Sequence, residues 1–518
     1  MKTIIKYLLI TAIVLAVGSC ESYLDITPKN NLNESQYYQN EEDAIETITT
    51  CYDPLKHPGG FNVNFFFLFT TFSDRAVHEA ANVNNFLFSP SYNKVLEIYT
   101  YLYKGVFRCN LALEKIPPIE MDEEKKEELL GQAYFLRGLY YFYLSSIYYR
   151  PPLITERIDN LEVQFTNAPR DSLRMRIISD LRRASETLPN EWDDANKGRA
   201  TAGAALGMMG KTYLYYEQFD SARHYLRQVK DLADNEGIYE LMMPQGNDSL
   251  DYCYAYQCNF SALDLTTPSG NTYDAENNRE SLFEIQFHYG GWEVWEGGWQ
   301  ADGSITSLYF GPDGYKNLAP EPEYRDQFEE TPSHPAGLSY DPRRYVMFYE
   351  PGDTIHYIDP ELEDAAWDAS MNMNAAISPG FGWAKYFDPA HLSNNGPTNL
   401  NLLRYADILL MLAEADFIVN GETSTPLAEE CLNAVRERAG LEPVDAVTRE
   451  AIIHERDIEL GFEWLRFFDL VRWSMYDDPW VDIKAMIPEF TENKNEYLPL
   501  PTYEIDLSRG GLEQNPGW

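Results

Sequence analysis

Apolar residues recur at helical spacing through most of the first half of the chain. This periodicity predicts helices over 42–51, 91–116, 125–149, 171–188, 201–216 and 221–233. Prolines follow three of these segments within two residues, and proline cannot continue a helix. The same periodicity returns over 402–420, 426–438 and 448–473. The pattern therefore predicts a mainly α protein.

One pair of predicted helices has the spacing of a tetratricopeptide repeat. Its Gly, Tyr, inter-helix aromatic, Ala and large apolar positions are Gly210, Tyr213, Phe219, Ala222 and Leu226. Small residues at two of these positions would let the helices approach closely. Looser copies are 132–149 with Ile177, Leu181, Ala184 and Pro189, and 402–419 with Ala428, Leu432 and Val435. We expect a scaffold of stacked helix pairs; the alternative is ordinary α-hairpins without repeat packing.

The helical pattern disappears between residues 235 and 400. Gly, Pro, Asn, Asp and aromatic residues dominate this region, which predicts turns and loops. The alternating sequence SLFEIQFH at 281–288 predicts a strand, and 344–349 is a second candidate. We expect an irregular, loop-rich lobe with a few short strands, inserted between helical parts at 41–234 and 401–518. Binding residues gather on loops that a rigid scaffold positions.

The first twenty residues resemble the signal sequence of a bacterial lipoprotein. Two lysines precede the apolar stretch 7–17, which is too short to span a hydrocarbon core of about 30 Å. Cys20 then follows Val-Gly-Ser, as in a lipobox, where the cysteine becomes the acylated first residue. An ordinary secretory signal is the alternative. We expect a signal peptide over 1–19, acyl chains such as palmitate on Cys20, and a polar tether over 20–40.

Charge and cysteine content narrow the possible partners. The 82 acidic and 41 basic residues give a net charge of −41, which disfavours nucleic acid as a partner. Aromatic residues make up 14% of the chain, a surplus that fits a surface stacking on sugars. The five cysteines after Cys20 are too scattered for a disulfide framework, although Cys253 and Cys258 could pair. Neither a metal site nor a membrane-spanning segment after Cys20 is expected.

Several motifs occur in a characteristic order. Residues 403–415 read LRYADILLMLAEA, 433–441 read NAVRERAGL, and 454–473 read HERDIELGFEWLRFFDLVRW. The segment YLDITP at 23–28 and the ending LPLP at 498–501 with QNPG at 514–517 complete the set. These motifs resemble the SusD/RagB family of outer-membrane nutrient-binding lipoproteins, and the resemblance covers nearly the whole chain.

The resemblance implies a binding protein without catalytic activity or a cofactor. Such proteins are lipid-anchored in the outer membrane, face the cell exterior and capture a glycan or another nutrient. They cover a SusC-like, TonB-dependent transporter, toward which their tetratricopeptide helices face. A glycan is the expected cargo here; a peptide is the alternative, because an acidic surface would favour basic peptides.

Enzyme motifs receive little support from the sequence. Ile458 removes the second histidine that His454-Glu455 would need for an HExxH zinc site. We expect instead that the charged residues around it form buried or half-buried ion pairs, namely Glu455, Arg456, Glu459, Arg466 and Asp469. Asp341-Pro342-Arg343 resembles a family segment and is expected to be structural. A surface glycoside hydrolase stays as an alternative. Such an enzyme needs two carboxylates at a set separation, and a sequence cannot show that distance.

Two segments are candidates for ligand contact. The first is 289–299, where Tyr289, Trp292, Trp295 and Trp299 lie among four glycines. A pyranose can stack on an exposed indole while neighbouring polar groups bind its hydroxyls. The alternative is that one or two of these tryptophans fix the loop to the lobe, and we expect this for at least one of them. The second segment, 75–88, precedes a predicted helix and includes Arg75, Asn82, Asn84, Asn85, Phe86 and Phe88.

Overall fold

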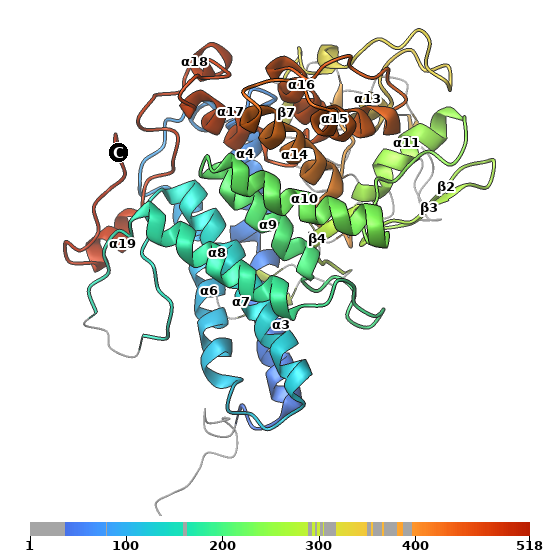
Figure 1. Cartoon of the computed structure of the whole chain (residues 1–518). Helices are drawn as coiled ribbons and strands as arrows, with labels where there is room; N and C mark the ends of the chain where they lie inside the picture. Colours follow the sequence, from blue (N-terminus) through green and yellow to red (C-terminus); the bar gives the residue numbers. More distant parts are fainter. Residues whose placement is uncertain are drawn as a thin grey trace, which may run out of the picture.

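The computed structural model describes residues 37–78, 80–158, 163–288, 293–295, 298–300, 304, 318–349, 354–355, 365–366, 381–386 and 396–518. The expected signal peptide and Cys20 lie outside these residues. Within them, helices form most of the body, and a lobe of loops and short strands lies beside the helices (Figure 1). The expected mainly α class is confirmed. Among the described helices, none has the length and apolar character needed to cross a bilayer.

Long helices follow one another in a stack. They are α3 (Glu41–Lys56), α6 (Asn93–Lys115), α7 (Glu123–Tyr148), α8 (Arg170–Thr187), α9 (Ala202–Tyr215), α10 (Phe219–Glu236), α14 (Tyr405–Val419) and α15 (Pro426–Arg438). Each packs against the next in this order, so that α10 contacts α14 although a whole lobe separates them in sequence. Figure 1 shows the stack running from blue through green to orange. The predicted helix pairs α7–α8, α9–α10 and α14–α15 are therefore present.

Side-chain caps fix where several of these helices begin. Asn40, Asp122, Thr201 and Thr425 each accept a hydrogen bond from a backbone N–H in the first turn of α3, α7, α9 and α15, respectively. Such a bond satisfies a donor that the helix itself cannot pair. The sequence therefore specifies these starts locally, which explains why periodicity alone located them to within a few residues.

Close helix contacts confirm the repeat register. A Cβ atom on Gly210 of α9 would lie 2.5 Å from Cγ of Leu226 on α10, and Ala222 beside it is fully buried. In the preceding pair, a Cβ atom on Gly138 of α7 would lie 2.9 Å from Cγ of Leu181 on α8. Only glycine fits at such distances, so the small residues let the helix axes approach as the spacing predicted.

Three predicted elements need correction. Residues 402–404 belong to strand β12 (Leu400–Arg404), not to the helix that starts at Tyr405, because they pair antiparallel with β4 (Ser281–Ile285). The long helix predicted over 448–473 is two helices, α16 (Arg449–Glu459) and α17 (Arg466–Met475), and positive φ angles at Phe462 and Trp464 break it. The strand predicted at 344–349 is mostly helix α13 (Pro342–Met347), which Asp341 caps.

The lobe contains short antiparallel strand pairs. Besides β4–β12 they are β1 (Ala76–His78) with β7 (Leu318–Pro320), β2 (Leu265–Thr266) with β3 (Thr272–Tyr273), β5 (Glu293–Trp295) with β6 (Gly298–Gln300), β8 (Phe348–Tyr349) with β11 (Gly382–Trp383), and β9 (Thr354–Ile355) with β10 (Ala365–Ala366). Shorter helices complete the description: a π-helical segment at Pro58–Phe65, α4 (Phe66–Thr71), α5 (Ala81–Asn84), α11 (Ser249–Gln257), α18 (Ile483–Met486) and α19 (Thr502–Leu507). The strand predicted from 281 is confirmed over its first five residues as β4.

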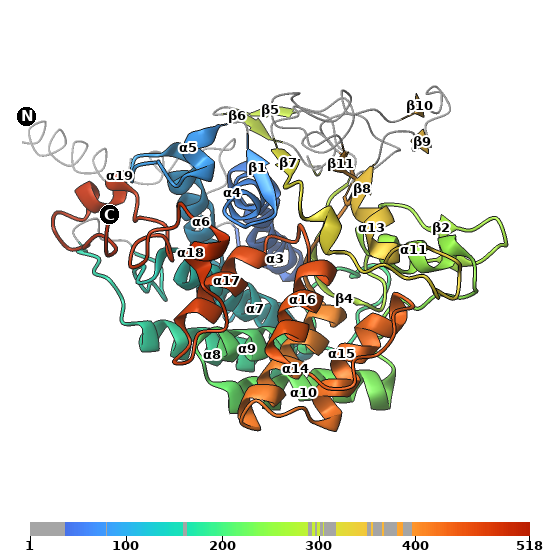
Figure 2. The ribbon, with the colours of Figure 1, turned by 90° about the horizontal axis from the view of Figure 1, so that it is seen from above.

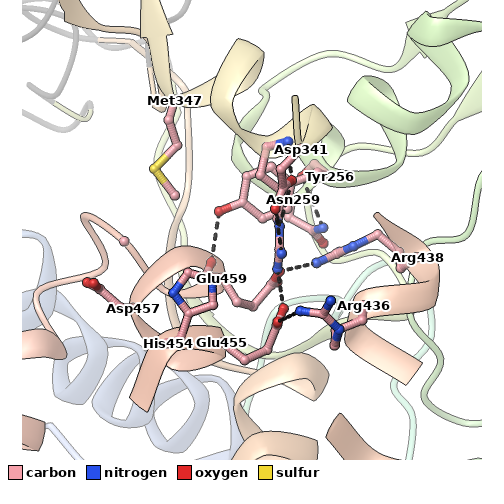
Figure 3. A network of polar contacts seen from close by, with 12 residues as sticks. Tyr256, Asn259, Asp341, Met347, Arg436, Arg438, His454, Glu455, Asp457 and Glu459 are labelled. Atoms are coloured by element: carbon pink, nitrogen blue, oxygen red, sulfur yellow. Dashed lines mark hydrogen bonds and ion pairs between the residues drawn. The ribbon is translucent and has the colours of Figure 1, made fainter. Parts of the chain in front are cut away.

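Buried ion pairs join the lobe to the helices. Glu459 on α16 accepts from Arg343 of α13 at 2.8 Å, from Arg404 of β12 at 2.5 Å and from Arg438 of α15 at 2.5 Å. Figure 3 shows how α16 presents Glu455 and Glu459 to this cluster. Burial disfavours the charged carboxylate, but the three guanidinium groups outweigh it and hold the pKa of Glu459 well below its usual range. The expected ion pairs around this segment are confirmed, and the partners of Glu459 come from three different elements.

Candidate ligand-binding site

The pairing of β1 with β7 places the start of the second candidate segment beside a strand that follows the first candidate segment in the chain. Ala76 lies opposite Pro320, and His78 lies opposite Leu318. Strand β7 follows the hairpin formed by β5 and β6 in the chain, so the segment that starts at Arg75 lies beside the continuation of the tryptophan-rich segment. Figure 2 shows β1, β7 and the β5–β6 hairpin along the same edge of the molecule.

Arg75 is anchored by an ion pair with α16. Its Nε lies 3.0 and 2.9 Å from the two carboxylate oxygens of Asp457, and its guanidinium lies 5.0 Å from the ring centroid of Tyr324. Burial opposes the charge of Asp457, but Arg466 and Arg75 outweigh it and lower the pKa of this carboxyl. The Arg75 side chain is 15% exposed. This geometry gives Arg75 a positioning role at the start of the segment.

Asn84 closes the loop between β1 and α5. Its amide oxygen accepts from the backbone N–H of His78 at 2.8 Å, and its amide nitrogen donates to the carbonyl of His78 at 2.6 Å. Both ends of the side-chain amide are therefore used within the protein. Asn82 is exposed and Asn85 is half-buried on the same short helical turn. The polar groups that this turn offers to solvent come from Asn82 and Asn85 rather than from Asn84.

Phe86 and Phe88 pack the segment onto the core. Phe86 is buried and stacks on Phe72 with ring centroids 4.7 Å apart. Phe88, half-buried, stacks on the same ring at 5.7 Å and contacts Trp518 at 5.2 Å. Between them, Leu87 is 70% exposed, which no pattern in the sequence predicts. The two phenylalanines thus fix the end of the segment 75–88 to the apolar core.

The tryptophan-rich segment forms an antiparallel hairpin. Val294 pairs with Trp299 and Trp295 pairs with Gly298, which places these two tryptophans on adjoining strands. Tyr289 and Trp292 lie outside the described residues.

The cysteines that the structure describes are all unpaired and buried. Cys253 and Cys258, which could have paired, are both free. Burial raises the pKa of the Cys253 thiol to about 12, so the thiol stays protonated at neutral pH. Over the described part of the chain, no group of three or more His, Cys, Asp and Glu side chains is arranged to hold a metal ion.

Comparison with known proteins gives matches along nearly the whole chain. The model of the SusD family matches residues 270–518, and a model described as starch-binding associating with outer membrane matches residues 22–214. A SusD-like protein of Bacteroides ovatus is 26% identical, over 91% of this chain and 83% of its own. SusD-like protein P25 of Formosa agariphila is 23% identical, over 97% of both chains.

Solved structures with the same fold agree with these matches. A laminarin-binding SusD-like protein superposes with a TM-score of 0.73 at 24% identity, covering 93% of this chain and 100% of its own. Surface glycan-binding protein A of Bacteroides thetaiotaomicron superposes with a TM-score of 0.69 at 21% identity, covering 92% of this chain and 99% of its own. The motifs, the stacked helix pairs and the two matching models together show that this chain belongs to the SusD/RagB family.

Proposed function

We propose that this protein binds a glycan noncovalently and does not cleave it. The observation that carries the proposal is the β1–β7 pairing, because it brings a turn with accessible amides beside the continuation of an indole-rich hairpin. Aromatic walls with a few placed polar groups are the usual construction of a sugar site. The printed names of two structural neighbours, laminarin-binding and glycan-binding, support the same ligand class.

The residues of this face divide into two roles in our proposal. Tyr289, Trp292, Trp295 and Trp299 supply the stacking surfaces, and Asn82 and Asn85 bind sugar hydroxyls. Arg75, Asn84, Phe86 and Phe88 hold the turn in place through the contacts described above. This division can be tested. Substitutions of the residues that contact the sugar should alter affinity alone, and substitutions of the residues that hold the turn should alter stability as well.

Single Trp→Ala variants at 292, 295 and 299 test the site. Truncating a residue that dominates binding typically costs at least about 2 kcal/mol, or about thirtyfold in affinity. Calorimetric titration with a glycan that binds the parent, together with a thermal melt, should show at least one variant that loses binding and melts normally. Trp480→Ala is the matched control, because this half-buried indole lies beside Trp473 and Phe417, away from β1 and β7.

Parent-like binding by all three variants would contradict the site. Binding of basic peptides in place of every glycan tested would favour the peptide alternative on the same fold. Release of reducing sugar from a bound glycan would contradict the absence of catalysis.

We further propose that an acylated Cys20 anchors the protein in the outer membrane, where the protein faces the cell exterior. There, the protein delivers its ligand to a SusC-like TonB-dependent transporter. The lipobox-like sequence and the outer-membrane description of the matching family model support this placement. Several acyl chains on one residue would bind a bilayer stably, since each buried CH₂ contributes about 0.8 kcal/mol. Cys20→Ala should therefore release the protein from the membrane fraction, and unchanged retention would contradict the anchor. Co-purification of the transporter with the wild-type protein tests the delivery partner.

A further inference from the structure

A groove with an excess of positive charge runs along α3, and its lining residues lie outside the segments 75–88 and 289–299 described above. Its volume is about 600 Å³, and the segments 195–199 and 284–288 form its other walls. Four cationic side chains line it, namely Lys56, Arg108, Lys197 and Arg199, and His288 is also part of its lining. Only two acidic residues line it, although the whole chain has twice as many acidic as basic residues. The groove therefore reverses the overall charge of the molecule.

Both acidic residues of the groove are already engaged. Asp53 forms an ion pair with Arg108 at 2.5 Å. Glu284 is buried and accepts hydrogen bonds from the backbone N–H of Asn277 at 3.0 Å and from the side chain of Asn399 at 2.9 Å. Burial raises the pKa of Glu284, although Lys197 lies near enough to oppose the shift. Neither acid forms an ion pair with Lys197 or Arg199 in the described part of the structure.

Neutral groups hold Arg199 in position. Its Nε donates to the side-chain oxygen of Asn196 and its Nη1 to that of Gln132, both at 3.0 Å. Gln132 also accepts from the hydroxyl of Tyr52 at 3.0 Å, which ties the arginine to the wall formed by α3. A guanidinium fixed by neutral acceptors keeps its full charge and its remaining donors for an anion.

Gly198 allows this arrangement. Its φ of +89° is unfavourable for other residues, and a Cβ atom there would lie 2.5 Å from Cδ of Gln286. The segment that carries Lys197 and Arg199 can therefore lie directly against residues 284–288. Lys197 and Arg199 also line a second cleft of about 560 Å³ on the other side, where Arg279 is the further cation and Glu191, Asp264, Asp274, Glu276 and Glu284 are the acids. Cations therefore outnumber acids on the side of α3, and acids outnumber cations in the second cleft.

We propose that this groove binds the carboxylate or sulfate groups of an acidic glycan, with Lys197 and Arg199 as the principal contacts. The proposal rests on the glycan-binding function and specifies the class of glycan. Nucleic acid is a poor alternative occupant, because a net charge of −41 repels a polymer with a phosphate at every nucleotide. An acidic saccharide chain can alternate charged with neutral sugars, and its hydroxyls suit the Tyr52 and Gln286 side chains that also line the groove.

Titrations with charged and neutral polymers test the inference. Polygalacturonate supplies carboxylates, dextran sulfate supplies sulfates, and laminarin and dextran are neutral. Lys197→Gln and Arg199→Gln should each weaken polyanion binding about fivefold, and the double variant more than tenfold, at low ionic strength where such pairs are least screened. Arg183→Gln is the control, because this exposed arginine pairs with Glu127 on the outer surface. Neutral-glycan binding should stay unchanged in every variant.

The outcomes separate this inference from the proposed function. Binding of only one of the two polyanions would identify the anionic group and support the inference. A parent protein that binds a neutral glycan but neither polyanion would overturn it and leave glycan binding intact, as would parent-like polyanion binding by the variants. A parent that binds no saccharide at all would contradict both. Lys197 is exposed, so Lys197→Gln decides the matter even if Arg199→Gln fails to fold.

Discussion

The helical stack and the loop-rich lobe depend on apolar contacts and buried charges to different degrees, although the stack also has buried ion pairs such as Arg137–Asp180 and Lys211–Asp407. In the stack, apolar side chains and glycines fix neighbouring helices, as at Gly210 and Leu226. In the lobe, buried charges connect residues that lie far apart in the chain, as Arg343 and Arg404 do at Glu459. The comparison teaches that short strands and loops can be placed firmly without a large sheet, provided that ion pairs join them to a rigid scaffold. Loop sequences can then vary while their base stays fixed.

Glu459→Ala should produce the largest loss of stability. It removes one carboxylate from three buried guanidinium groups, and leaving buried charges uncompensated costs about 3–5 kcal/mol. Urea denaturation measures the loss as a lower midpoint. Glu437→Ala, at an exposed position of the neighbouring helix α15, is the control. If both variants unfold at the same midpoint, the charge cluster does not hold the lobe.

Gly210→Leu should destabilise the stack by about 3 kcal/mol, the upper end of the usual cost of overpacking. The added side chain would overlap Leu226, which already lies 2.5 Å from the position of a Cβ atom. Arg227→Leu adds the same side chain on the exposed face of α10 and should change the free energy of unfolding little. A thermal melt of Gly210→Leu that matches the parent would show that the repeat register is wrong.

Acid should weaken the charge clusters before it affects the apolar contacts. Burial disfavours the charged form of Asp407, but Lys211 and Arg456 outweigh it and lower its pKa to about 2 from the usual 3.8. A carboxyl with a lowered pKa stabilises the fold above its unfolded pKa, and this stabilisation, about 2 kcal/mol, is lost as the pH falls from about 4 to about 2. Denaturation curves at several pH values should show a shallower loss over this range in Asp407→Asn. Identical pH profiles would contradict the assignment.

Asn84→Ala should have the smallest effect, about 1 kcal/mol on stability, since it removes two hydrogen bonds that close the loop after β1. We expect it to lower glycan affinity as well, through a less ordered turn. Asn82→Ala, at an exposed position, should lower affinity without changing the melt. The reverse pattern would mean that the two asparagines have exchanged the roles proposed for them.

Much of the stack could be predicted from the sequence, because the buried face of each helix requires apolar residues at every third or fourth position. The errors lie where tertiary contacts override that period. Residues 402–404 have the apolar pattern of the following helix, but pairing with β4 makes them a strand. The break between α16 and α17 depends on positive φ angles at Phe462 and Trp464, and phenylalanine and tryptophan rarely adopt such angles, so the sequence does not predict the break.

The candidate site was predictable only in part. The sequence indicated which segments carry amides and indoles, but it could not show that β1 pairs with β7, since two such short strands have no local signal. The sequence likewise could not show that Phe86 packs into the core on Phe72, because this contact depends on the tertiary fold. The cationic groove could not be predicted from the sequence, because Lys197 and Arg199 line it together with α3 and residues 284–288, which are distant in the chain.

The central claim is that affinity resides in the face formed by the segments 75–88 and 289–299, and stability in the helical scaffold with its buried ion pairs. It is tested most directly by titrating one neutral glycan into the parent, Trp295→Ala, Trp299→Ala and Glu459→Ala, at a temperature where all four are folded. We predict that at least one of the tryptophan variants binds about thirtyfold more weakly than the parent with an unchanged melting temperature. Glu459→Ala should bind with near-parental affinity although it melts at a much lower temperature. Parent-like affinity in both tryptophan variants, or loss of binding only together with loss of stability, would contradict the account.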